Sequence, residues 1–169
     1  VRKTVGDDVS IYIDANNGYY RKQAIYMAKE FEQFQVGWFE EPLIPDDIDG
    51  MAEISKATSI PIATGEHEYT KYGFRDLISR GGVDIVQPDL HYYGGLIRST
   101  RVARMAAVAE MSTTVHISGG FGFIYMLHFA AFTPDIGRYQ EYKRGIEKYR
   151  DWFSPALEIK DGQMSVPKG

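Results

Sequence analysis

The sequence lacks cysteine, a long apolar run and a block of basic residues, and each absence narrows what the protein can be. Without cysteine, the 169-residue chain forms neither disulfides nor thiolate metal sites. No window reaches the roughly 18 consecutive apolar residues of a membrane span, and no segment has a signal-peptide pattern. The net charge of −4 comes without clustered Lys and Arg, which argues against nucleic acid. We therefore expect a cytoplasmic protein with neither a membrane nor a nucleic-acid partner.

The sequence does contain an alternation of β-like runs and helical patterns. Apolar residues at helical spacing predict helices over residues 20–34, 46–55, 73–80, 96–111 and 121–132. We expect His128, inside the last and most apolar pattern, to pack against the core. Strands alternating with helices predict a parallel α/β fold. Six strand-like runs are present, the last being GRYQEY, whereas a closed barrel needs eight strands in about 250 residues.

We therefore predict a partial (β/α) TIM-type barrel over residues 1–150. Residues 151–169 leave the strand and helix rhythm and are predicted to form a C-terminal tail. The chain starts with VRKTVGDDVS, which has the character of a helix end and a loop. We expect a fragment or one half of a split protein.

A polar residue closes each β-like run, and these residues recur about every 25 positions. They are Asp14, Glu40, Glu66, Asp89, His116 and Glu141. Because the carboxyl ends of parallel strands gather at one rim, we expect their side chains to converge there. Carboxylates on three adjacent strands supply the oxygen ligands that Mg²⁺ prefers. Glu41 has the opposite strand parity from Glu40 and is the less suitable ligand.

Six motifs together resemble a known family. DANN, WFEEP, TGEHEYTKYGF, VQPDLHYYGG, VHISGG and RYQEY, in this order and spacing, resemble the mandelate racemase subgroup of the enolase superfamily, in particular its sugar-acid dehydratases. TGEHEYTKYGF is most similar to L-rhamnonate dehydratase. The resemblance implies the third to eighth strands of a (β/α)7β barrel, with the capping domain absent from this chain.

The resemblance also implies partners and a reaction. The N-terminal portion of the same protein, or a companion chain, would complete the barrel, the tail would pack on the capping domain, and the assembly would be a homo-oligomer. The reaction would be Mg²⁺-dependent dehydration of a sugar acid, an aldonate. Removal of the α-proton would give a metal-stabilised enediolate, and loss of water would then give a 2-keto-3-deoxy acid.

Roles for individual residues follow from the same resemblance. The Mg²⁺ ligands would be Asp14, Glu40 and Glu66. His116 would act as general base or acid, oriented by Asp89. The substrate would be contacted by Glu141 at its carboxylate and by Asn16 and His67 at other oxygens.

Alternatives remain at this stage. A racemase or epimerase of a 2-hydroxy acid would use the same intermediate with a second base, carried upstream of Val1. A non-catalytic barrel fragment needing a partner chain would carry idle motifs. Glu141 precedes the charged run KRGIEKYR and could instead form a surface salt bridge. A hydrolase barrel is disfavoured because the sequence has no His-x-His pair.

Overall fold

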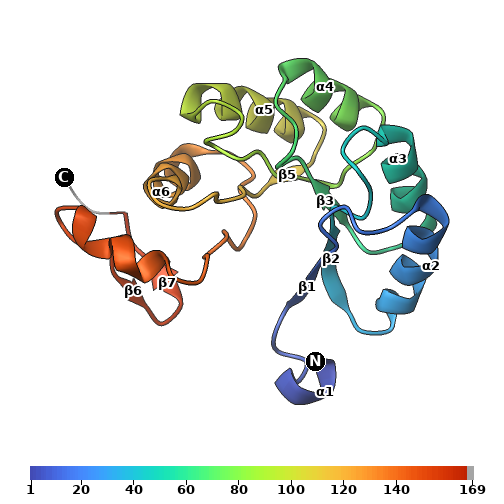
Figure 1. Ribbon diagram of the computed structural model, residues 1–169, viewed down its shortest axis with the longest axis horizontal. Coiled ribbons are helices and arrows are strands. Elements are labelled where there is room, and N and C mark those ends of the chain that lie inside the picture. Colours follow the sequence, from blue (N-terminus) through green and yellow to red (C-terminus); the bar gives the residue numbers. More distant parts are fainter. Residues whose placement is uncertain (167–169) are drawn as a thin grey trace.

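A five-stranded parallel sheet organises the computed structural model, which describes residues 1–166 (Figure 1). The strands are β1 (Ile11–Asp14), β2 (Val36–Glu40), β3 (Ile62–Thr64), β4 (Ile85–Val86) and β5 (Ser112–Thr113). They pair in chain order, and each pair is parallel. This order and direction confirm the predicted partial barrel.

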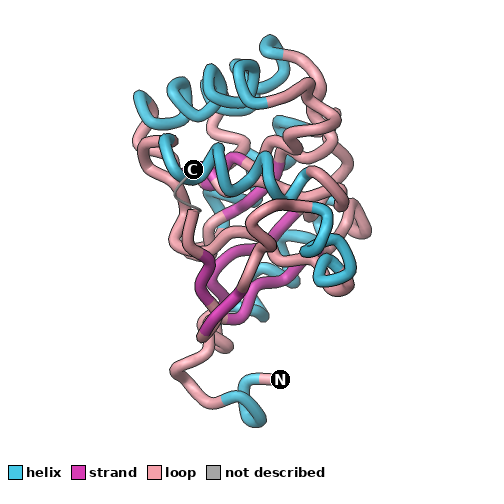
Figure 2. Tube along the Cα trace, turned by 90° about the vertical axis from the view of Figure 1, so that its left-hand side faces the viewer, coloured by secondary structure: helices cyan, strands magenta, loops and turns pink. Residues whose placement is uncertain are grey.

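The predicted helices connect the strands. After a short α1 (Arg2–Val5), the helices are α2 (Arg21–Glu32), α3 (Ile48–Ala57), α4 (Lys71–Ser79), α5 (Leu96–Val108) and α6 (Gly122–Phe132). Helices α2 to α6 follow an arc around the outside of the strands (Figures 1 and 2). Side-chain caps fix two of the helix starts: Asp47 accepts the Gly50 N–H at 3.0 Å, and Thr70 accepts the Gly73 N–H at 2.9 Å.

The core lies between the sheet and this outer layer of helices. Small residues on α2, Ala24 and Ala28, are fully buried and let the helix approach β2, where Phe39 is also fully buried. A second cluster joins α4 and α5 to β4, and a third surrounds α6. Burying each large apolar side chain contributes about 1.5–3 kcal/mol. The strands thus present one face to the helices and leave the other for polar side chains.

The predicted strand GRYQEY does not form. Ile136 makes an isolated parallel bridge with Thr113, and residues 138–142 are irregular. The Gln140 side chain accepts the Val115 N–H at 3.3 Å and donates to the Gly137 carbonyl at 2.8 Å. The Gln140 side chain therefore hydrogen-bonds backbone groups that would otherwise pair in a strand ladder.

The C-terminal region consists of a 3₁₀ helix (Ile146–Trp152) and a hairpin of β6 (Ile159–Lys160) with β7 (Gln163–Met164). Leu157 is buried in the cluster around α6. The domain boundary at residue 150 and a role against a capping domain stay predictions, and residues 167–169 lie outside the described part.

The expectation for His128 was wrong: it lies on the exposed side of α6.

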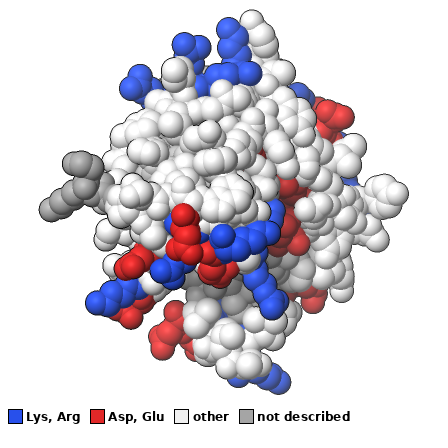
Figure 3. Space-filling model, turned by 60° about the vertical axis from the view of Figure 1, so that its left-hand side comes forward, with Lys and Arg blue, Asp and Glu red and all other residues white. Residues whose placement is uncertain are grey.

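The surface carries mixed charge. On the face shown in Figure 3, Lys and Arg side chains lie beside Asp and Glu in one band, next to a broad uncharged area. Within residues 1–166, the helices are all too short or too polar to cross a bilayer.

Candidate active site

The strand ends bring several predicted site residues to one rim. Asp14 and Glu40 end β1 and β2 and are direct partners in the ladder. Glu66 follows β3 by two residues, and Asp89 and His116 form an isolated parallel bridge beyond β4 and β5. The barrel geometry thus places these residues on neighbouring strand ends.

His116 and Asp89 form a tight pair. The imidazole Nδ1 lies 2.7 Å from Asp89 Oδ2, and Nε2 lies 3.3 Å from Glu66 Oε2. Asp89 is fully buried, and its Oδ1 accepts the backbone N–H groups of His91 at 2.7 Å and Tyr92 at 2.8 Å. The ring is therefore oriented from one side by a carboxylate that the backbone itself holds.

Burial and neighbouring groups shift the pKa values of both His116 and Asp89. Burial opposes the charge on His116, but the hydrogen bond to Asp89 and the nearby charge of Glu66 prevail and raise its pKa. Burial likewise acts to raise the pKa of Asp89, yet the hydrogen bonds from His116 and Tyr92 lower it overall. Both shifts stabilise the ion pair that the two residues form whenever His116 carries a second proton.

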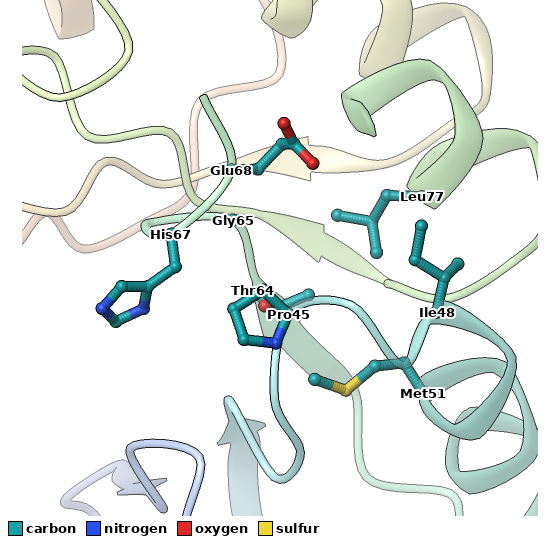
Figure 4. A pocket seen from close by; sticks show the side chains of 8 residues that line it. All are labelled: Pro45, Ile48, Met51, Thr64, Gly65, His67, Glu68 and Leu77. Atoms are coloured by element: carbon teal, nitrogen blue, oxygen red, sulfur yellow. The ribbon is translucent and has the colours of Figure 1, made fainter. Parts of the chain in front are cut away.

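Glu41, Glu66 and His67 form a second polar group at the rim. Glu41 is 1% exposed, and its Oε2 lies 2.9 Å from His67 Nδ1, which in turn is 3.6 Å from Glu66 Oε1. One ligand atom from each of the three residues lies within 4.8 Å of the others. The His67 ring extends away from the apolar residues Met51 and Leu77, which line a small pocket behind it (Figure 4).

The parity argument against Glu41 was wrong. Its backbone has φ of 40°, in the left-handed region, so the strand alternation has already ended at this residue. The side chain consequently lies with Glu66 and His67. The Glu-Glu-Pro sequence hinted at a break after β2 but did not reveal the direction of the second carboxylate.

Glu40 lies in an electronegative setting. Burial raises its pKa to about 7, and the charges of Asp14 and Glu66 act in the same direction. Hydrogen bonds from Gln87 and from the Trp38 indole, the latter at 2.9 Å, oppose this shift. Burial, with repulsion from Glu41 and Asp14, also raises the pKa of Glu66 against the attraction of His116. Asp14, Glu40 and Glu66 are thus close enough for their charges to interact.

The remaining predicted residues lie at the edges of this region. The Glu141 carboxylate accepts the Ile117 N–H, and its charge acts on His116. Asn16 is exposed in a left-handed turn after β1, where its N–H donates to Asp14 Oδ1 at 2.7 Å. Trp38, which the sequence did not single out, adds a hydrogen-bond donor to the rim.

Fold and site together define a class of protein: a partial parallel barrel with buried carboxylates and a His–Asp pair at the carboxyl ends of its strands. The chain belongs to the family described as Enolase C-terminal domain-like, whose profile matches residues 1–169. This membership confirms the resemblance seen in the motifs.

Curated relatives include sugar-acid enzymes. D-galactarolactone cycloisomerase of Agrobacterium fabrum is 34% identical over 100% of this chain and 47% of its own length. Arabinonate dehydratase of Saccharolobus solfataricus is 34% identical over 99% of the chain and 45% of its own length. L-rhamnonate dehydratase of Saccharopolyspora erythraea is 33% identical over 76% and 33%, respectively. The chain spans less than half the length of these relatives.

Solved structures agree with the fold. A mandelate racemase/muconate lactonizing enzyme-like protein from Roseovarius sp. TM1035 matches with a TM-score of 0.91 at 28% identity, over 99% of this chain and 42% of that one. A variant of L-talarate/galactarate dehydratase liganded with Mg and L-glucarate matches with a TM-score of 0.81 at 30% identity, over 98% and 40%.

Proposed function

We propose that this chain forms part of a Mg²⁺-dependent sugar-acid dehydratase of the enolase superfamily. The observation that carries the proposal is His116, whose ring is fixed by buried Asp89 on one nitrogen and directed toward Glu66 on the other. Dehydratase relatives at 29% to 34% identity support the reaction type. The substrate would be an aldonate or a related sugar acid.

The donor set fits a hard divalent cation. Asp14, Glu40 and Glu66 would hold Mg²⁺ through carboxylate oxygens. The raised pKa values of Glu40 and Glu66 reflect burial and crowded negative charge, which a cation would offset. When bound, the metal would stabilise negative charge that develops on the substrate carboxylate.

His116 would move the proton. Its Nδ1–H donates to Asp89, so Nε2 is the atom that can take the α-proton from the substrate and later return it to the departing hydroxyl. Asp89 would stabilise the imidazolium that forms in between. Glu141, Asn16 and His67 would contact substrate oxygens, with His67 held by Glu41.

A second reaction class is favoured by one specific observation. One of the curated relatives that match 100% of this chain is named D-galactarolactone cycloisomerase. Cycloisomerisation would also begin at a carbon next to a carboxyl group but would not release water. Racemisation would change optical rotation with no keto product, so the products separate all three reactions.

The test is product analysis with purified protein that contains this chain. The protein is incubated with Mg²⁺ and with arabinonate, xylonate, gluconate, rhamnonate, galactarate and a sugar lactone, and 2-keto acids are detected as semicarbazones. We expect keto-acid formation that His116→Asn abolishes and that His128→Asn, a matched change on the exposed side of α6, leaves intact. Isomerised lactone or racemised acid without keto acid would replace the dehydratase assignment.

The assembly is part of the proposal. An open sheet leaves unpaired strand edges, which favour association. Completion by an N-terminal portion or a companion chain, homo-oligomer formation and a cytoplasmic location stay predictions. Gel filtration combined with mass spectrometry of active material tests the first two, and a non-catalytic fragment would show no turnover even when completed.

A further inference from the structure

The Trp38 indole is a neutral hydrogen-bond donor to one of the proposed cation ligands. Its Nε1–H lies 2.9 Å from Glu40 Oε2, and both side chains are partly buried. Trp38 and Glu40 are two positions apart on β2, so they project from the same face of the sheet. The indole N–H thus holds one carboxylate oxygen of Glu40, in addition to the hydrogen bond from Gln87 to the same carboxylate.

Trp38 is itself held in place by aromatic packing. The Tyr12 ring stacks on the indole with centroids 3.7 Å apart and planes inclined by 21°. Tyr139, from the segment after α6, meets Tyr12 edge-on at 6.2 Å. Residues from the first strand and from the far end of the partial barrel therefore support the same indole.

Gly37 makes this stacking possible. A Cβ atom at this position would lie 2.4 Å from Cε1 of Tyr12, closer than real contacts allow. Only glycine leaves room for the Tyr12 ring to lie against β2 beside the indole. The sequence Gly-Trp-Phe-Glu thus encodes the support as well as the carboxylate.

We propose that Trp38 is a positioning residue that orients the Glu40 carboxylate for divalent-cation binding. The inference rests on the proposed function, because it requires Glu40 to ligate the cation. Groups that hydrogen-bond a metal-ligating carboxylate fix its direction, and losing one lowers metal affinity by about 10- to 100-fold. Trp38 needs no contact with the cation or the substrate to have this effect.

Substitution tests the hydrogen bond directly. Trp38→Phe removes the N–H and keeps an aromatic ring, whereas Tyr12→Phe keeps the stacked ring and removes only a hydroxyl. By isothermal titration calorimetry with Mg²⁺ alone, we expect Kd to rise about 10- to 100-fold for Trp38→Phe and to stay unchanged for Tyr12→Phe. An unchanged Kd for folded Trp38→Phe would overturn the inference.

Fluorescence gives a second readout that needs no change at Trp38. These 169 residues contain two tryptophans, Trp38 and Trp152, so Trp152→Phe leaves the rim indole as the tryptophan emitter of this chain. We expect Mg²⁺ to change its emission with the Kd found by calorimetry, and Trp38→Phe, which keeps Trp152, to show no change. Constant Trp38 emission at saturating Mg²⁺ would overturn the inference even if Trp38→Phe failed to fold.

One further variant separates this inference from the proposed function. If Glu40→Gln binds Mg²⁺ as tightly as the parent protein, Glu40 is not a ligand, and the proposed metal site is wrong in that part. If Glu40→Gln weakens binding and Trp38→Phe does not, the metal site stands and only the role of Trp38 is wrong.

Discussion

Replacing Asp89 by Asn is the sharpest perturbation of the proposed proton-transfer group. In the parent structure Asp89 Oδ1 accepts two backbone N–H groups, and Oδ2 accepts the His116 Nδ1–H at 2.7 Å. The asparagine oxygen can keep the two backbone bonds, because the backbone offers only donors there. The amide NH₂ then faces Nδ1, which can no longer donate.

The size and sign of the effect follow from this geometry. A hydrogen bond to a charged group contributes about 1.5–3 kcal/mol, so Asp89→Asn should lower the pKa of His116. In the parent protein the folded pKa lies above the ordinary value of 6.5. The stability that His116 adds is therefore fully present below pH 6.5 and is lost as the pH rises through the pKa of the folded state. The stability difference between parent and variant should shrink over that same interval.

Two assays check this reasoning. NMR titration of the histidine Cε1–H signals, with EDTA present, gives the pKa of His116, and urea unfolding on both sides of 6.5 gives the stability difference. In active protein, kcat should fall about 10²- to 10⁴-fold. An unchanged His116 pKa in folded Asp89→Asn would refute the argument, whatever happened to activity.

Three further predictions test other parts of the structure. Glu66→Gln should weaken Mg²⁺ binding severalfold or more by calorimetry, because it removes an anionic oxygen from the proposed ligands. Glu32 accepts the Ser59 N–H at 2.7 Å, and that hydrogen bond is the largest of several that lower the pKa of Glu32 below the ordinary 4.5. The stability that Glu32 adds is therefore fully present above pH 4.5 and is lost as the pH falls through the pKa of the folded state. Glu32→Gln should thus lower the urea midpoint at neutral pH but not in acid. Phe39→Ala, at a fully buried position, should cost about 3–5 kcal/mol in urea unfolding, whereas Tyr26→Ala, at a side chain that is 61% exposed, should cost far less.

Helix positions could be predicted from the sequence because local signals determine them. The helix expected to begin at residue 96 begins at Leu96, directly after two glycines, and the one expected to end at Phe132 does end there, before Pro134. Parallel pairing in chain order followed from the alternation of strands and helices. Short-range periodicity and backbone restriction are sufficient for these features.

The sequence could not show that the predicted last strand does not form, because its formation depends on contacts between distant segments. GRYQEY has the composition of a strand, yet the N–H groups of Val115 and Ile117 donate to the side chains of Gln140 and Glu141. Nothing in the local pattern distinguishes a side-chain acceptor from a backbone acceptor. The direction of Glu41 escaped prediction for a related reason, since a single left-handed residue cancels the alternation.

The sequence predicts which residues belong to the site more easily than it predicts which of them contact one another. Glu66 lies between two histidines, with Oε2 at 3.3 Å from His116 Nε2 and Oε1 at 3.6 Å from His67 Nδ1. His67 is nearer to Glu41, at 2.9 Å, and His116 is nearer to Asp89, at 2.7 Å. The shorter contacts go to the most deeply buried carboxylates, so Asp89 and Glu41, and not Glu66, anchor the two rings. Glu66 is therefore the carboxylate of this group that is bound least tightly by the protein and is most open to a cation.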